Sequence, residues 1–212
     1  MNTLDKILDN GIIAISRGFY EEKLMKAVSR LIKGGINAFE VTFEQGGDDL
    51  RTAEAITMLK SAFGNECAIG AGTVLTESQL ELAHSAGAEY IISPNTDIGI
   101  IRGTKELGLV SIPGAMTPTE IVTAVGAGAD AVKLFPAGSL GIDYFKAVRA
   151  PLPGIKLFAV AGVNLSNIAD FKRAGACGFG ISSSLFNRKL IDEGKFDDLE
   201  YIARAFLEQI GF

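Results

Sequence analysis

The sequence contains few of the residues that bind metals or form disulfides. Its 212 residues include one histidine, His84, and two cysteines, Cys67 and Cys177. We therefore expect no metal centre, and we place His84 on the surface of a predicted helix. The cysteines lie in strand-like apolar runs, which indicates buried, reduced thiols in a cytoplasmic protein rather than a disulfide.

Long hydrophobic runs and basic clusters are also missing. No apolar run approaches the roughly 20 residues that cross a membrane, and residues 1–10 carry Asp5 and Asp9 where a signal peptide is apolar. The net charge is −5, and Lys and Arg form no cluster. These absences argue against a membrane or nucleic-acid partner, so an anionic ligand would need a local positive site.

Nucleotide-binding motifs are absent too. No G-x-G-x-x-G follows the first predicted strand, and Gly70-Ala71-Gly72-Thr73 differs from a P-loop. We therefore expect no cofactor. With no metal to polarise a carbonyl group, a lysine that forms an imine is the remaining strong electron sink.

The sequence does contain a repeat of short apolar strand, loop and amphipathic helix. The predicted strands are Gly11–Ser16, Ala38–Phe43, Cys67–Gly72, Glu89–Ser93, Leu109–Pro113, Ala129–Phe135, Lys156–Val160 and Cys177–Ile181. The predicted helices are Tyr20–Lys33, Asp48–Phe63, Thr76–Ser85, Asp97–Leu107, Thr117–Val125, Ile142–Val148, Leu165–Arg173 and Phe196–Ile210. Strict alternation of the two predicts a parallel sheet.

Eight such units in a chain of this length predict an α/β fold, a (β/α)8 TIM barrel that forms a single domain over residues 1–212. An open, doubly wound sheet is the alternative. Residues 1–10 are predicted to form an extra N-terminal helix that closes the bottom of the barrel. In such barrels the catalytic groups lie at the C-terminal ends of the strands.

Lys133 lies inside the predicted strand 129–135, next to apolar residues. Burying an unpaired ammonium costs several kcal/mol, so a lysine in this position is either paired or neutral. A neutral lysine in an apolar pocket is a nucleophile for a carbonyl carbon. The alternative is a lysine whose ammonium extends from the strand end to water.

Glu40 is the second candidate because alternate residues of a strand share a face. Glu40 points to the same side as Thr42, and Lys133 to the same side as Phe135. If both sides face the inside of the barrel, Glu40 and Lys133 form a proton carrier and a nucleophile. The alternative, a buried ion pair between them, requires the same placement.

Other strand ends offer groups that bind anions. Arg17 follows the first strand and suits a carboxylate or phosphate, unless it is a solvated loop residue. Thr73 follows the third strand and either binds a substrate carboxylate or caps a loop. Gly162-Val163-Asn164 and Ser182-Ser183-Ser184 follow strands seven and eight, where barrels often bind phosphate, although three serines also suit a polar turn.

Six short motifs occur together over most of the chain. They are Glu40-Val41-Thr42, Ile69-Gly70-Ala71-Gly72-Thr73-Val74, Ser93-Pro94, Pro113-Gly114, Thr117-Pro118-Thr119-Glu120 and Lys133-Leu134-Phe135-Pro136. With these motifs the chain resembles, over about residues 8–210, the class I aldolases that cleave 2-keto-3-deoxy-6-phosphogluconate (KDPG) and their 2-keto-4-hydroxyglutarate (KHG) and 6-phosphogalactonate relatives.

The resemblance implies roles for nine residues. Lys133 would form the Schiff base with the pyruvyl carbonyl, and Glu40 would move protons. The residues implied to bind substrate are Arg17, Thr73, Pro94, Phe135, Gly162, Ser183 and Ser184. Arg17 and Thr73 would hold the carboxylate end, and Pro94 and Phe135 would line the pocket. Gly162, Ser183 and Ser184 would receive the phosphate. When the chain is aligned with the family pattern, Ser183 is the serine that binds phosphate, and an alignment shifted by one residue would select Ser184 instead. Family members are homotrimers, so the resemblance also implies a homotrimer.

Three positions depart from the family pattern. Glu44 stands where many members have arginine, and a carboxylate there repels an anionic substrate unless it points away. The family's Pro-Thr-Gly-Gly turn is Ala159-Val160-Ala161-Gly162 here, and its Gly-Ser pair is Ser182-Ser183. These changes leave the lysine chemistry intact but affect the phosphate end of the site.

The expected activity is cleavage of a 2-keto-3-deoxy sugar acid to pyruvate and an aldehyde such as glyceraldehyde 3-phosphate. KDPG is the leading substrate, with 4-hydroxy-2-oxoglutarate second. The phosphogalactonate epimer and a non-phosphorylated keto acid are alternatives. Two rival classes stay open, namely a sugar-phosphate epimerase or isomerase on the same barrel and a barrel that binds a ligand without catalysis.

Overall fold

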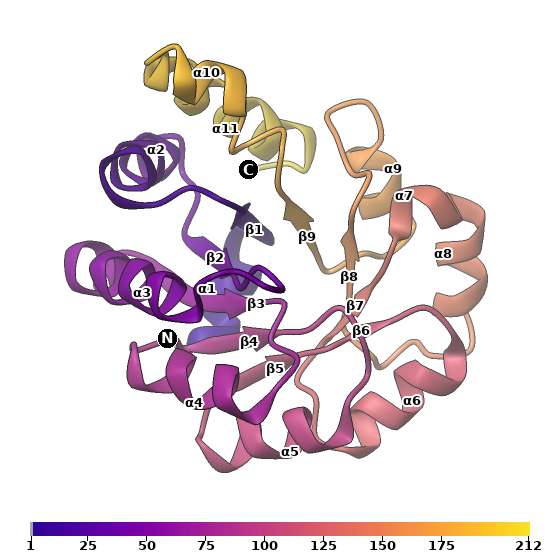
Figure 1. Ribbon diagram of the computed structural model, residues 1–212. Helices are drawn as coiled ribbons and strands as arrows, with labels where there is room; N and C mark the ends of the chain where they lie inside the picture. The colour runs from indigo at the N-terminus through magenta and orange to yellow at the C-terminus, as the bar shows by residue number, and fades with distance from the viewer. Residues whose placement is uncertain (1) are drawn as a thin grey trace.

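The strands of the protein all run parallel and are surrounded by helices, as the computed structural model of residues 2–212 shows (Figure 1). The strands are β1 (Ile12–Ser16), β2 (Ala38–Thr42), β3 (Ala68–Gly72), β4 (Tyr90–Ile92), β5 (Val110–Ile112), β6 (Gly114–Ala115), β7 (Val132–Leu134), β8 (Leu157–Val160) and β9 (Gly178–Ile181). The helices are α1 (Thr3–Asn10), α2 (Glu21–Lys33), α3 (Asp49–Phe63), α4 (Glu77–Ser85), α5 (Ile98–Glu106), α6 (Pro118–Gly126), α7 (Ala137–Leu140), α8 (Ile142–Arg149), α9 (Ile168–Arg173), α10 (Arg188–Asp192) and α11 (Phe196–Gln209).

The sheet closes on itself through one interrupted strand. Its order is β5-β4-β3-β2-β1-β9-β8-β7-β6, so β5 and β6 lie at the two ends of the order. They are two parts of one strand, separated by Pro113, which has no N–H to donate to a sheet. The Pro113 carbonyl still accepts from the Lys133 N–H at 2.9 Å. The predicted TIM barrel is therefore confirmed, and the open sheet is wrong.

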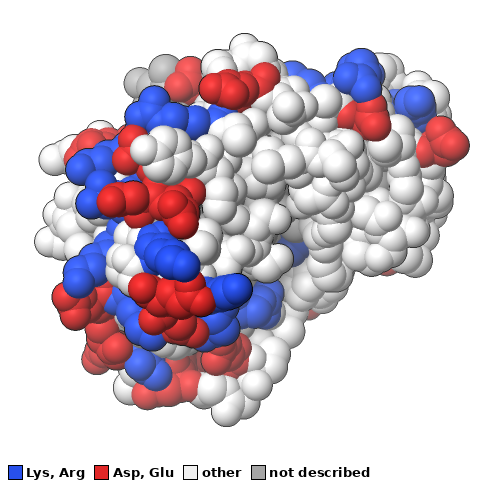
Figure 2. All heavy atoms as spheres, turned by 90° about the horizontal axis from the view of Figure 1, so that it is seen from above, with Lys and Arg blue, Asp and Glu red and all other residues white. Residues whose placement is uncertain are grey.

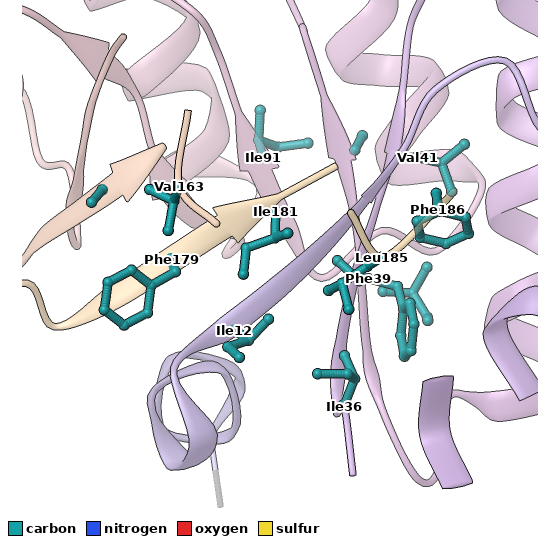
Figure 3. Close-up of a cluster of buried hydrophobic side chains, with 14 of the residues drawn as sticks. Ile12, Ile36, Phe39, Val41, Ile91, Val163, Phe179, Ile181, Leu185 and Phe186 are labelled. Carbon is teal, nitrogen blue, oxygen red and sulfur yellow. The ribbon is translucent and has the colours of Figure 1, made fainter. Parts of the chain in front are cut away.

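Along several strands, alternate residues are buried in two different clusters. Ile13 of β1 belongs to the cluster inside the barrel, whereas Ile12 belongs to the cluster between the strands and the helices. Phe39, Phe179 and Ile181 lie in the cluster between the strands and the helices, which Figure 3 shows. Alternate residues point to opposite faces of a strand, and this arrangement explains why the strands are continuous apolar runs.

Helix α1 covers the N-terminal end of the barrel, as expected for residues 1–10, of which Met1 lies outside the described residues. Ile7 is fully buried in the interior cluster. The Asn2 side chain accepts from the Asp5 N–H at 2.8 Å and caps the start of the helix. Gly11 ends it with φ of 71°, a left-handed conformation that turns the chain into β1.

Three elements are not expected from the sequence pattern. They are β6, α7 and α10, which are too short to show a hydrophobic period. The predicted seventh helix begins at Ile168 rather than Leu165 because residues before it form a turn. In this turn Asn167 Oδ1 accepts from the Asn164 N–H at 2.8 Å, and Asn164 Oδ1 accepts from the Ser166 N–H at 2.9 Å.

Charges of both signs are mixed on the surface. Figure 2 shows Lys, Arg, Asp and Glu side by side over the region of α2 and α10, with a largely uncharged surface on the opposite side of this view. Within residues 2–212, no helix is long and apolar enough to cross a membrane.

Candidate active site

A cavity of about 460 Å³ lies at the C-terminal ends of the strands, where barrels carry their chemistry. The cavity is lined by Ile15, Arg17, Glu40, Lys133, Phe135, Val160, Ala161, Gly162, Val163, Asn164, Gly180, Ser182, Ser183 and Ser184. Seven of the nine residues singled out in the sequence are in this set.

Lys133 enters the cavity from β7 and is only 7 % exposed. Its Nζ lies 4.8 Å from the centre of the Phe135 ring, two residues along on the same face. Within residues 2–212 the ammonium has no carboxylate within ion-pair distance. The predicted alternatives, an ammonium in water and a buried ion pair, are therefore both wrong for this geometry.

Glu40 enters the cavity from β2 and is 2 % exposed. Its carboxylate lies over Gly72 of β3, where a Cβ would overlap Oε1. The other oxygen, Oε2, is buried and has no hydrogen-bond partner among the described residues. Glycine at position 72 therefore leaves the space that Glu40 occupies.

Burial shifts the pKa values of the two groups in opposite directions. It raises the pKa of Glu40 above its usual range, although the positive charges of Lys133 and Arg17 act against this. It lowers the pKa of Lys133 from its usual value near 10.5, and Arg17 adds to the effect while Glu40 opposes it. Both shifts favour the neutral forms, so Lys133 is more nucleophilic than a surface lysine.

Arg17 follows β1 and lines the cavity as an exposed side chain. No carboxylate pairs with its guanidinium in the part of the chain that the structure describes. Glu44, which the sequence placed near the anion site, does not line this cavity. It is exposed, and its Oε1 would lie 2.9 Å from a Cβ on Gly18, in the neighbouring loop. Arg17 is thus available to a substrate anion, and Glu44 lies against the loop at Gly18, outside the lining of the cavity.

The loop after β8 borders the outer part of the cavity. Ala161 and Gly162 have φ of 69° and 75°, a left-handed conformation that is strained for alanine. The Ala161 carbonyl accepts from the Gly138 N–H at 2.8 Å, and a Cβ on Gly138 would lie only 2.6 Å from Gly162 Cα. Asn167 Nδ2 donates to the Gly162 carbonyl at 2.9 Å. The loop is therefore held by the backbone of Gly138 and by the side chain of Asn167.

The loop after β9 also borders the outer part of the cavity. The carbonyl of Ser182 accepts from the N–H groups of Leu185 and Phe186 at 3.0 and 2.8 Å, which forms a tight turn. Ser183 and Ser184 lie inside this turn, and their own N–H groups have no acceptor among residues 2–212. Free N–H groups at such a turn form a place for an anion.

Thr73 and Pro94 do not line the cavity. Both are half-buried and lie at the ends of β3 and β4. Thr73 has φ of 57°, and its carbonyl accepts from Gln45 Nε2 at 3.4 Å. The carbonyl of Pro94 lies against Gly114, where a Cβ would overlap it. The structure therefore brings these two residues to the same end of the barrel but not to the cavity wall.

Several lining residues were not selected from the sequence. They are Ile15, Val160, Ala161 and Gly180, whereas Val163, Asn164 and Ser182 belong to the two loop stretches that the sequence indicated for phosphate. Strand parity could have found Ile15, Val160 and Gly180, because each points to the inside of the barrel. Among residues 2–212 no three His, Cys, Asp or Glu side chains gather as metal ligands, and both cysteines are free.

A closed (β/α)8 barrel with a buried lysine and a buried carboxylate at its C-terminal mouth is an arrangement that suits an enzyme acting on a carbonyl compound. Comparison with known proteins narrows this class. The family model for KDPG and KHG aldolase matches residues 5–202. The chain belongs to this family, whose members are carbon–carbon lyases.

Individual relatives agree with this assignment. The chain is 39 % identical to the probable 2-dehydro-3-deoxy-6-phosphogalactonate aldolase of Rhizobium meliloti, over 84 % of this chain and 83 % of that one. It is 36 % identical to the 2-dehydro-3-deoxy-6-phosphogalactonate aldolase of Escherichia coli, over 94 % of this chain and 96 % of that one. It is 34 % identical to the 2-dehydro-3-deoxy-phosphogluconate aldolase of Treponema pallidum, over 85 and 84 %.

Solved structures show the same relationship. A structure described as native KDPGal superimposes with a TM-score of 0.85 at 33 % identity, over 93 % of both chains. The KDPG aldolase of Legionella pneumophila superimposes with a TM-score of 0.80 at 26 % identity, over 92 % of this chain and 93 % of that one. That structure holds pyruvate captured as a covalent carbinolamine intermediate.

Proposed function

We propose that this aldolase cleaves a 2-keto-3-deoxy-6-phospho sugar acid through a Schiff base on Lys133. The observation that carries the proposal is the placement of Lys133, which is buried, has no ion-pair partner among residues 2–212 and faces Glu40 across one cavity. The covalent pyruvate adduct in the Legionella pneumophila relative supports it, because an adduct of that kind requires a nucleophile at the keto carbon.

The reaction follows from the two buried groups. Neutral Nζ of Lys133 attacks the C2 carbonyl, and the carbinolamine takes up one proton, from Glu40 or a water molecule, and loses water to give a protonated imine. A base removes the C4 hydroxyl proton, the C3–C4 bond breaks, and its electron pair moves into the imine to form an enamine. Glu40 is the base, directly or through a water molecule, and returns the proton to C3. Hydrolysis of the imine then releases pyruvate and regenerates Lys133.

The anionic ends of the substrate fit the two remaining parts of the cavity. The guanidinium of Arg17 suits the carboxylate next to the imine. The free N–H groups and hydroxyls of Ser183 and Ser184, together with Gly162, suit the phosphate. Thr73 and Pro94 stay predictions from the family pattern, Thr73 for the carboxylate end and Pro94 for the pocket wall.

The galactonate epimer is the substrate that we favour over KDPG. The relatives at 39 and 36 % identity carry the phosphogalactonate name, and the phosphogluconate aldolase is 34 % identical. A homotrimer and a cytoplasmic location stay predictions, the first from the resemblance to the family and the second from the two free cysteines. Light scattering after size exclusion tests the trimer.

Pyruvate release from four compounds tests the substrate. These are the two C4 epimers of 2-keto-3-deoxy-6-phosphohexonate and the same two acids without phosphate. We expect kcat/KM to be highest for the phosphorylated galactonate and at least about tenfold lower without phosphate, the effect of losing hydrogen bonds to a charged group. Equal rates with and without phosphate would contradict the phosphate site, and a higher rate with KDPG would reverse the epimer preference.

A further inference from the structure

Tyr90 is a buried tyrosine that the reaction described above does not use. It lies on β4 with no exposed surface, and its hydroxyl has no hydrogen-bond partner among the described residues. A buried hydroxyl without a partner is destabilising, so its presence calls for an explanation. Most buried tyrosines find a partner for this group.

The sheet register places Tyr90 in one row with Glu40. Gly70 of β3 pairs with Glu40 on one side and with Tyr90 on the other. The three residues point to the inside of the barrel, because each has the parity of that face. No side chain separates Glu40 from Tyr90 in this row, because the residue between them is glycine.

The ring of Tyr90 occupies the space that Gly70 leaves open. A Cβ on Gly70 would lie 2.5 Å from Cζ, the ring atom that carries the hydroxyl. The phenol ring therefore lies over Gly70 of β3, the strand between β4 and β2, and the Glu40 carboxylate lies over Gly72, the next inward position of β3. Gly70 and Gly72 together form a path without side chains between the two groups.

Both groups also lack partners. Oε2 of Glu40 and the hydroxyl of Tyr90 are two of the four buried side-chain atoms without a hydrogen bond in residues 2–212. The carboxylate oxygen accepts and the phenol donates, so one buried water molecule between them satisfies both groups. Ser16 Oγ and Asn37 Oδ1 are the other two atoms.

We propose that Tyr90 is a positioning residue whose phenol donates a hydrogen bond, through one buried water molecule, to Oε2 of Glu40 and stabilises its ionised form. This inference rests on the proposed role of Glu40 as the base. The phenol keeps its proton throughout, because burial, together with the negative charge of Glu40, raises the pKa of Tyr90 well above 10. A donor to the charged form lowers the pKa of a carboxylate, which offsets part of the effect of burial on Glu40.

The charged groups near the pair set the sign of the expected pH effect. Lys133 and Arg17 face Glu40, and both lower its pKa. Glu40, Glu89 and Cys67 are the titratable groups that act on Tyr90. Removing the phenol hydroxyl leaves all of these in place, so a change in the pH profile reports the hydrogen bond to Glu40 alone.

Tyr90→Phe is the direct test, because it removes one hydroxyl and keeps the ring over Gly70. We expect the acid limb of kcat/KM to move upward by about one pH unit, the size expected for one hydrogen bond to a charged group. The rate on that limb then falls about tenfold while the high-pH plateau stays within about twofold. Tyr201→Phe, on a side chain that is 70 % exposed, is the matched control and should leave the profile unchanged.

Two further measurements separate this inference from a structural effect and from the proposed function. Borohydride trapping of pyruvate tests the imine itself, and Tyr90→Phe should still form the adduct. In a Glu40→Gln background, adding Tyr90→Phe should leave the pH profile of trapping unchanged, since the carboxylate is gone. An unshifted acid limb in Tyr90→Phe would overturn the inference, as would a shift that persists without Glu40. A wild-type protein that forms no adduct would instead refute the proposed function.

Discussion

The deep half and the outer half of the cavity are built in different ways. The deep half consists of Lys133 and Glu40, two side chains that strand register and neighbouring glycines hold in place. The outer half consists of the loops at Gly162 and Ser183, where backbone N–H groups and hydroxyls face the solvent. The comparison teaches that the chemistry depends on strand geometry, whereas the recognition of the phosphate depends on loop conformation.

Lys133→Ala is expected to have the largest effect on the deep half of the cavity. Without the amine no imine forms, so we expect kcat to fall by at least about four orders of magnitude. The barrel should remain folded, because the substitution removes an ammonium that is costly to bury. A coupled pyruvate assay and circular dichroism check both expectations. Normal turnover in this variant would remove the lysine mechanism.

Gly72→Ala tests whether Glu40 must lie where the structure places it. A methyl group at this position would overlap Glu40 Oε1, so the carboxylate has to move. We expect kcat to fall about 100-fold, the effect of misplacing a catalytic group by about 1 Å. Gly126→Ala is the control, since a Cβ there meets nothing within 4 Å in helix α6. Equal kcat for the two variants would show that the position of Glu40 does not matter.

Ser183→Ala and Ser184→Ala test the outer half and the register of the phosphate serine. We expect KM for the phosphorylated substrate to rise about tenfold in Ser183→Ala and less in Ser184→Ala, with kcat nearly unchanged. Steady-state kinetics with both variants provide the measurement. A larger effect at Ser184 would identify Ser184, rather than Ser183, as the serine that binds the phosphate. A loss of kcat would show that these serines take part in the reaction rather than in binding.

Ala161→Gly has the smallest expected effect. Alanine is strained by about 1–2 kcal/mol at a left-handed φ, and glycine relieves this strain while it adds freedom to the unfolded chain. We expect a net gain of about 0.5–1 kcal/mol, or roughly 1–4 °C in Tm. Ala127→Gly, where φ is −82°, should instead lose stability in the same calorimetric experiment. A lower Tm for Ala161→Gly would show that the loop is not strained.

The sequence predicted the deep half better than the outer half. The alternation of strands and helices predicted the barrel, and parity placed Glu40 and Lys133 on one inner face because a strand has a period of two. Loops have no such period. The contacts of Gly138 with the Ala161 loop, and the distance of Thr73 and Pro94 from the cavity wall, follow from tertiary packing that no local pattern encodes.

For Tyr90, which lies in a strand, the sequence pattern also did not predict the tertiary contacts. Parity alone could place it inside the barrel, but its unpaired hydroxyl became visible only with the positions of Gly70 and Glu40 on neighbouring strands. Glu44 shows the converse, because the sequence suggested a conflict with an anionic substrate and the structure places this side chain against Gly18, outside the lining of the cavity.

Mass spectrometry after borohydride reduction in the presence of pyruvate tests the central claim most directly. Reduction fixes an imine as a stable secondary amine, so the modified residue can be identified by peptide mapping. The account predicts one pyruvyl adduct on Lys133 and none in Lys133→Ala. An unmodified protein, or an adduct on a surface lysine alone, would contradict the Schiff-base mechanism and favour an epimerase or a barrel that only binds its ligand.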